Sequence, residues 1–285
     1  MIELALRRRF FSDEIAAVAA ISTTRLVDAM ADVPRERFLR PGPWLVRGEG
    51  DLFTGARRTA DDDPQRVYHN YSIAIDPARQ IFNGAPGLIA ALIDKLAPTP
   101  GSRVLHVGAG LGYYSALIGH TVGVSGRVVA IEVDRDLAEE ARSNLASIPW
   151  IEVTASDGTG PFRERFDAIL VNAGVTHPQE SWLDALAPGG RLILPLTVAM
   201  PQMGAIGKGL VVLVTKGPDD VWLATALNMV AVYSGIGLRD DSLNDALGRA
   251  LRQAPFPPLR RLRRDPHEAG AACWLHCSTC CLSLD

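Results

Sequence analysis

The sequence predicts an α/β fold built on a doubly wound, mostly parallel sheet. A short apolar run at residues 104–107 is followed by glycines at 108, 110 and 112 and then by a stretch that can form a helix. This order is typical of a strand, a tight turn and a helix. Four further apolar runs alternate with helical patterns before residue 196. Strands that alternate with helices at this spacing indicate a parallel sheet with helices on both faces.

The elements after the glycine turn follow in a regular order. We expect strands at residues 127–132, 150–154, 166–172 and 191–195, with helices at 136–145 and 182–190, the second of which stops at Pro-Gly-Gly. Further on, two apolar runs flank Gly217-Pro-Asp-Asp, which predicts a hairpin. We expect a helix at 240–252 and a linker or extended arm over the Pro- and Arg-rich residues 254–266.

The segment before the glycine turn is less regular. We expect one helix that Ser12 caps and that runs through Ile21, and another that begins at Thr23. Residues 40–80 show little periodicity, so we expect irregular structure there, either a functional loop or a surface insertion. A helix at 87–96 leads into the first strand.

Candidate binding groups lie where predicted strands end. Gly108 follows the first strand, Glu132 ends the second, and Asp157 with Gly158 follows the third. Ligands of doubly wound sheets bind at the carboxyl ends of the strands, and an acid about 20 residues after the glycines can accept hydrogen bonds from ribose hydroxyls. The spacing G-x-G-x-G differs from the G-x-G-x-x-G of dinucleotide folds, which disfavours a nucleotide-dependent oxidoreductase.

The glycine loop resembles that of class I S-adenosylmethionine methyltransferases. Three more stretches resemble protein-L-isoaspartate O-methyltransferases: Val33-Pro-Arg-Glu-Arg-Phe, Asp157-Gly158, and Leu186-Ala-Pro-Gly-Gly-Arg-Leu-Ile-Leu-Pro195. The sequence is identified as a divergent member of that family over roughly residues 25–200. The resemblance implies a seven-stranded Rossmann-like sheet, S-adenosyl-L-methionine as cofactor, and methylation of a carboxylate in a protein or peptide.

The resemblance also assigns roles to residues. It places Gly108, Gly110 and Gly112 under the cofactor, Glu132 on the ribose, and Asp157 on the adenine amino group, with Gly158 allowing close approach. Aligning the family's substrate loop on Pro86 places Asn83 and Gly84 at the acceptor, as the candidate catalytic positions. Gly84 stands where the family has a serine, and Asn83 could supply an amide donor instead.

His106 stands where the family usually has an acidic residue. It either contacts the methionine end of the cofactor in another way or is a core residue of a buried strand, and the core interpretation is favoured.

Two functions follow from these features, the first of them with a variant. The first is a protein or peptide carboxylate methyltransferase resembling the isoaspartyl enzymes. A peptide-modifying, natural-product enzyme is the main variant, which the missing serine favours. A degenerate, non-catalytic cofactor-binding module is the alternative that His106 and Gly84 support.

Composition limits the partners. The chain has 285 residues, 47% of them hydrophobic, and a net charge of −3, so it is expected to be globular and not to bind nucleic acid. It has no apolar run of the length that spans a membrane and no secretory pattern at its start. We therefore expect no membrane partner and a cytoplasmic location. The expected domains are an extension at 1–80, a cofactor-binding core at 81–236, and a helix with an Arg- and Cys-containing tail at 237–285.

All four cysteines, Cys273, Cys277, Cys280 and Cys281, lie in the tail, with His276 among them. Their spacing resembles an iron–sulfur motif of radical enzymes, which sits near the start of a different fold. A zinc site is conceivable, but structural zinc sites usually pair two separated ligand clusters. Packed or exposed thiols without a metal are the favoured interpretation.

Overall fold

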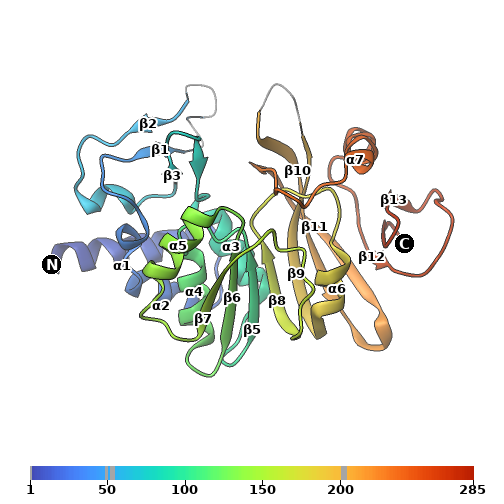
Figure 1. Cartoon of the computed structure of the whole chain (residues 1–285), viewed down its shortest axis with the longest axis horizontal. Coiled ribbons are helices and arrows are strands. Elements are labelled where there is room, and N and C mark those ends of the chain that lie inside the picture. Colours follow the sequence, from blue (N-terminus) through green and yellow to red (C-terminus); the bar gives the residue numbers. More distant parts are fainter. Residues whose placement is uncertain (1, 49–50, 52–54, 200–203) are drawn as a thin grey trace. The chain divides into compact units, whose positions relative to one another are not determined.

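The computed structural model describes residues 2–48, 51, 55–199 and 204–285, and Figure 1 labels most of its helices and strands. The chain forms two units, each discontinuous in sequence. Unit 1 comprises Met1–Ser102, Ala109–Ala130 and Asp134–Thr154, and unit 2 comprises Arg103–Gly108, Ile131–Val133 and Ala155–Asp285. After the glycine turn, unit 1 thus includes two helices and most of two strands, whereas most of the main sheet belongs to unit 2. The domain boundaries expected from the sequence remain a prediction.

Unit 1 begins with two packed helices, α1 (Ile2–Val18) and α2 (Thr24–Asp32). Ser12 lies inside α1, so its predicted role as an N-cap is wrong. Its hydroxyl instead donates to the carbonyl of Val27 at 2.5 Å and joins the two helices. The start of α2 directly after Thr23 is as predicted.

A small antiparallel sheet occupies part of the segment that was expected to be irregular. It has the order β2-β1-β3-β4, with β1 (Leu45–Arg47), β2 (Arg57–Arg58), β3 (Ser72–Asp76) and β4 (Ile81–Phe82). The strands are too short to give a periodic pattern, so the expectation of irregular structure over 40–80 is wrong where they lie. Residues 49–50 and 52–54 of that segment are outside the described residues.

The rest of unit 1 contains three helices and part of the main sheet. The helices are α3 (Pro86–Leu96), α4 (Tyr113–Val122) and α5 (Arg135–Asn144). Asp134 caps α5 by accepting from the amides of Asp136 and Leu137. The first part of β6 (Arg127–Glu132) lies beside β7 (Ile151–Ala155), since the Val128 amide donates to the Trp150 carbonyl at 2.9 Å.

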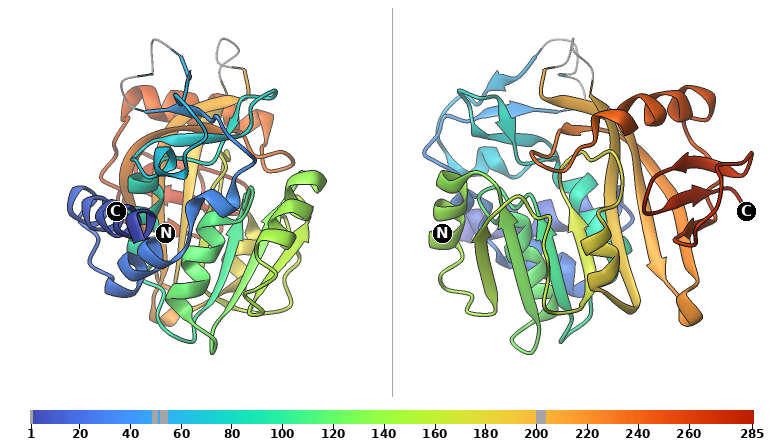
Figure 2. Two further views of the ribbon diagram at one scale, coloured as in Figure 1. Left: turned by 90° about the vertical axis from the view of Figure 1, so that its left-hand side faces the viewer. Right: turned by 45° about the vertical axis from the view of Figure 1, so that its right-hand side comes forward.

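Unit 2 contains a mixed sheet. Its parallel part consists of β5 (Arg103–Val107), β8 (Phe166–Val171) and β9 (Leu186–Ala199). The long strands β10 (Ile206–Lys216) and β11 (Trp222–Tyr233) continue it as an antiparallel hairpin, as predicted, and Figure 2 shows them as one twisted ribbon. The α-helices among the described residues of this unit are α6 (Glu180–Ala185) and α7 (Asp241–Gln253).

Three short strands extend this sheet beyond β11. They follow in the order β12 (Arg261–Arg263), β14 (Cys281–Ser283) and β13 (Cys273–His276), all antiparallel. The expected linker at 254–266 thus contains a strand, β12, that pairs with a strand on each side.

The helix predicted at 182–190 ends earlier than expected. Leu186 already pairs with Phe166, and the Pro-Gly-Gly that was expected to stop the helix lies inside β9.

The observed architecture is α/β with helices and a mixed sheet, which confirms the predicted class in this coarser form. Among the described residues, no helix combines the length and the apolar character that crossing a bilayer requires.

Candidate active site

The glycine turn joins β5 to α4 through three backbones that favour glycine. Gly108, Gly110 and Gly112 have φ of 82°, 55° and 94°. For residues other than glycine, this left-handed conformation costs about 1–2 kcal/mol of free energy. Gly112 directly precedes the first turn of α4, and the positive end of a helix dipole can face an anionic or polar ligand.

The first glycine is held between strand ends of unit 2. The Gly108 amide donates to the Ile131 carbonyl of β6 at 2.8 Å, and the Asn172 amide donates to the Val107 carbonyl at 2.8 Å. A Cβ at Gly108 would lie 3.1 Å from the Asn172 carbonyl oxygen. A side chain at Gly108 would therefore strain both the left-handed backbone and the contact with Asn172.

Glu132 and Asp157 follow the neighbouring strand ends in the same unit. Glu132 is buried, with 8% of its surface exposed, and its carbonyl accepts from the Ser156 amide at 3.0 Å. Asp157 is exposed, and its Oδ1 accepts from the amide and the hydroxyl of Thr159 at 3.0 and 2.8 Å. These two hydrogen bonds lower the pKa of Asp157, so the carboxylate is ionised at neutral pH.

Gly158 completes this group. It has φ of 80°, and a Cβ there would lie 2.8 Å from Val107 Cγ1. Its carbonyl accepts from the buried Trp182 indole at 2.8 Å. Unit 2 thus brings four predicted site residues, Gly108, Glu132, Asp157 and Gly158, to the carboxyl ends of neighbouring strands.

The two candidate acceptor residues lie in unit 1, at the end of β4. Asn83 pairs with β3 through its backbone and side chain, because its Oδ1 accepts from the Ile73 amide at 2.9 Å. Gly84 has φ of 81°, and its carbonyl accepts from the Tyr114 hydroxyl at 2.9 Å. Part of the Asn83 side chain is therefore used to hold the loop.

Three residues that support this loop were not identified from the sequence. Asn70 Oδ1 accepts from the Gly87 amide at 2.8 Å at the start of α3, and Tyr114 holds Gly84. Arg35 is fully buried, and its guanidinium donates to the carbonyls of Val67, His69 and Tyr71. The Val-Pro-Arg stretch was a signal for Arg35, but only the structure shows that it fixes the chain before β3.

His106 is completely buried in β5, and burial lowers its pKa to about 4. The imidazole is therefore neutral at pH 7, which agrees with the core interpretation. A hollow of about 860 Å³ in unit 2 is lined mainly by β12 and the β10–β11 turn, and contains none of the predicted site residues.

Known proteins resemble both the sequence and the fold. The family model for protein-L-isoaspartate (D-aspartate) O-methyltransferase matches residues 57–208, which include every predicted site residue. The enzyme named protein-L-isoaspartate O-methyltransferase from Methylorubrum populi is 34% identical over 75% of this chain and 88% of its own length. The one from Aeropyrum pernix is 33% identical over 65% of this chain, and the match spans 64% of that relative.

The chain belongs to this family. The family predicted from the sequence is confirmed, and S-adenosyl-L-methionine as cofactor and the methyltransferase class follow from membership.

Solved structures support the fold. A protein-L-isoaspartate O-methyltransferase superposes with a TM-score of 0.62 at 22% identity, over 88% of this chain and 73% of the other. A β-aspartate methyltransferase from Plasmodium falciparum in complex with S-adenosyl-L-homocysteine gives 0.61 at 18% identity, over 80% and 98%.

Proposed function

We propose that this protein transfers a methyl group from S-adenosylmethionine to a carboxylate of a protein or peptide. The observation that carries the proposal is the run of left-handed glycines at 108, 110 and 112, followed by acids at the ends of the next two strands. Bare backbone at the turn suits a nucleoside, and the acids are acceptors for its hydroxyl and amino groups.

We propose the following roles for the residues. Glu132 accepts hydrogen bonds from the ribose hydroxyls, and Asp157 accepts from the adenine amino group. Asp157 Oδ1 accepts two hydrogen bonds from Thr159, so Oδ2 is the oxygen that would accept from the ligand. Gly158 keeps the backbone beside the ligand free of a side chain.

Methyl transfer to a carboxylate requires no acid or base residue of the protein. When bound, the cofactor supplies a methyl carbon that its sulfonium already activates. A carboxylate acceptor is ionised at pH 7, so its oxygen forms the new O–C bond without a general base. The S–C bond breaks as that bond forms, and the products are a methyl ester and S-adenosylhomocysteine. The chain's residues place the acceptor in line and exclude water.

Asn83 and Gly84 are proposed to lie at the acceptor. Since Asn83 Oδ1 accepts from Ile73, its amide nitrogen is the part that can donate to the acceptor carboxylate. Gly84 has no hydroxyl where the family has a serine. This favours, within the proposed function, an acceptor other than an ordinary isoaspartyl residue, such as a carboxylate of a dedicated peptide.

Three finer features are part of the same proposal. Strands β5 to β11 correspond to the seven-stranded core of the fold class, with β12 to β14 as additions. Residues 1–80, 81–236 and 237–285 serve as extension, core and tail. The four free thiols favour a reducing compartment such as the cytoplasm.

Calorimetric titration with S-adenosylhomocysteine tests the cofactor site first. Methanol release from labelled S-adenosylmethionine then tests turnover, with an isoaspartyl peptide and the same peptide carrying aspartate. Binding with release from the isoaspartyl peptide alone supports repair chemistry. Binding without release points to another acceptor or to the non-catalytic alternative, and absence of binding contradicts the proposal.

A further inference from the structure

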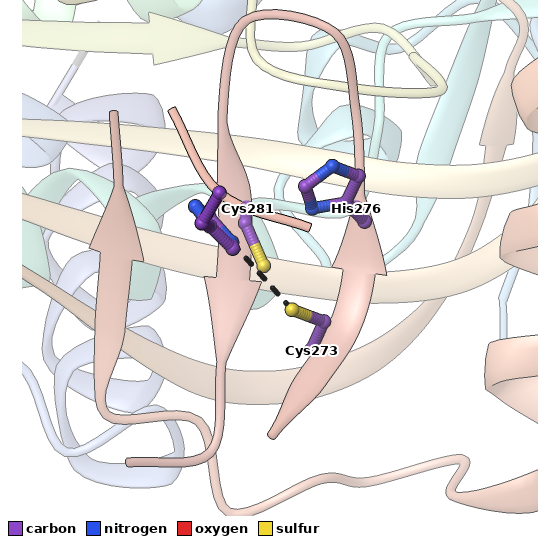
Figure 3. Close-up of side chains that lie close together, drawn as sticks. Cys273, His276 and Cys281 are labelled. Carbon is purple, nitrogen blue, oxygen red and sulfur yellow. Dashed lines mark hydrogen bonds between the residues drawn. The ribbon is translucent and has the colours of Figure 1, made fainter. Parts of the chain in front are cut away.

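We propose that the C-terminal segment binds one structural Zn²⁺ ion through His267, Cys273, His276 and Cys281. These four residues occupy two strands and the connection before them, all within unit 2, and three of them are labelled in Figure 3. The proposed site is separate from the methyltransferase site and does not depend on the proposed function.

The ligand atoms are already gathered. One donor atom from each of the four residues lies within 4.8 Å of all the others. Cys273 Sγ is 3.6 Å from His267 Nε2. Zn–S bonds of about 2.3 Å and Zn–N bonds of about 2.0 Å give tetrahedral edges of about 3.3–3.8 Å. A pair 4.8 Å apart therefore needs to close by about 1–1.5 Å around an ion.

The strand register explains why these side chains meet. In the pairing of β13 with β14, His276 lies opposite Cys281 and Cys273 lies opposite Ser283. Opposite residues share a face of the sheet. Cys273 and His276 are three residues apart and would point to opposite faces of a regular strand. The register shift between Cys273 and Leu275 adds a residue to the strand, so the side chains of Cys273 and His276 lie on the same face as that of Cys281.

His267 is oriented by the chain before β13. Its Nδ1 lies 2.8 Å from the Asp265 carbonyl oxygen. Because a carbonyl only accepts, Nδ1 carries the proton and the lone pair of Nε2 faces Cys273. A ligand histidine whose other nitrogen donates to a carbonyl is the usual outer-shell arrangement of zinc sites.

The Asp265 side chain is itself held, because Arg263 of β12 donates to both of its carboxylate oxygens. The connection that carries His267 is thus anchored on the adjacent strand.

The remaining ligands also fit a metal site. The Gly270 amide donates to Cys273 Sγ at 3.4 Å, which suits a thiolate. His276 Nδ1 is buried, and no described residue hydrogen-bonds it. Two thiolates balance the charge of a divalent cation, and two sulfurs with two imidazoles in a tetrahedron favour zinc. With four protein ligands the site would be closed, which indicates a structural role.

The other two cysteines provide matched controls. Cys277 and Cys280 lie in the turn between β13 and β14, where the Cys277 amide donates to the Cys280 carbonyl at 2.8 Å. They are outside the gathered cluster. A proposal based on cysteine content alone would treat all four thiols alike, whereas the geometry assigns the metal to Cys273 and Cys281.

The experiment measures zinc in the purified full-length protein by mass spectrometry of the metal, and then replaces zinc by Co²⁺. We expect about one zinc per chain. We expect a cobalt spectrum with a thiolate charge-transfer band and intense tetrahedral ligand-field bands. The variants Cys273→Ser, Cys281→Ser and His267→Gln should bind less than a tenth of that zinc, whereas Cys277→Ser and Cys280→Ser should keep it.

The variant His267→Gln distinguishes loss of metal from misfolding. It changes no residue of either strand, so it should lose the metal and keep the far-ultraviolet circular dichroism spectrum. Titration of thiols in denaturant without reductant tests the alternative that Cys273 and Cys281 form a disulfide. In the variant Cys277→Ser, which cannot form a Cys277–Cys280 disulfide, three reactive thiols after chelation support the zinc site, and one contradicts it. Zinc that the Cys277 and Cys280 variants lose, or zinc that none of the five variants changes, also contradicts it.

Discussion

At the residue scale, the proposed cofactor site contains a buried carboxylate. Glu132 ends β6 with 8% of its surface exposed, so hydrogen bonds to it form with little competition from water. Hydrogen bonds to charged groups contribute about 1.5–3 kcal/mol.

Glu132→Gln should therefore weaken S-adenosylhomocysteine binding by about tenfold or more, as measured by calorimetry. Glu152→Gln is the control, because Glu152 is an exposed acid that pairs with Arg127 at the surface. Equal affinities of the two variants would remove Glu132 from the site.

Gly84, which stands in the proposed substrate loop where the family has a serine, gives a second prediction. Gly84 has φ of 81°, and a Cβ there would lie 3.1 Å from Ile89 Cγ1. Gly84→Ser should therefore lower stability by about 1–2 kcal/mol and should not raise methanol release, as denaturant unfolding and the release assay would show.

Gly189→Ser is the matched control for this change. Gly189 has φ of 77°, and nothing lies within 4 Å of a Cβ there. Its loss of stability measures the backbone cost alone and should be the smaller of the two. A gain of isoaspartyl turnover in Gly84→Ser would show that the loop adjusts to the family's arrangement.

At the scale of elements, β5 carries a histidine inside the sheet. Burial lowers the folded-state pKa of His106 from 6.5 to about 4. The unfolded chain therefore binds more protons between these pH values, and stability rises with pH across that window. The contribution is fully present above about pH 6.5 and falls by up to about 3 kcal/mol as pH drops toward 4.

His106→Gln should flatten this dependence, as measured by urea unfolding at several pH values between 4.5 and 7.5. The same change at His120, an exposed residue on α4, should alter the slope less, because that ring keeps part of its hydration. An unchanged slope in His106→Gln would mean that His106 binds a proton equally well in both states.

Elements also differ in how clearly the sequence predicts them. The glycine turn, α3, α5 and β6 were expected within a residue or two of their observed bounds, because caps and regular periodicity define them locally. The strands β1 to β4 and β12 were not, since segments of two to five residues hold their conformation through pairing with distant strands.

At the scale of the whole molecule, the methyltransferase core and the C-terminal strands should respond separately to metal removal. Chelation should lower the melting temperature by about 5 °C or more, because structural zinc contributes directly to folding free energy. It should also open the connection around His267 to protease. Binding of S-adenosylhomocysteine should stay within about twofold, less than 1 kcal/mol.

Thermal unfolding, limited proteolysis and calorimetry before and after chelation check this prediction. Adding Zn²⁺ back should restore the original melting temperature, whereas Mg²⁺ should not, because thiolate and imidazole ligands do not suit it. A melting temperature that chelation leaves unchanged would speak against a structural ion.

The sequence by itself determined the α/β class, the family and the glycine turn. Glycine spacing, strand-end acids and short family stretches are patterns along the chain, so they can be recognised before the contacts of a residue such as Gly108 with distant strands are known. The proposed site residues were all named on this basis.

Only the tertiary structure decided what depends on contacts between distant segments. It showed that Arg35 holds the carbonyls of Val67, His69 and Tyr71. It also gathered His267 with Cys273, His276 and Cys281. The sequence favoured metal-free thiols because structural zinc sites usually pair two separated ligand clusters. The register shift that brings Cys273 and His276 to one face is set by the partner strand, which no local pattern reveals.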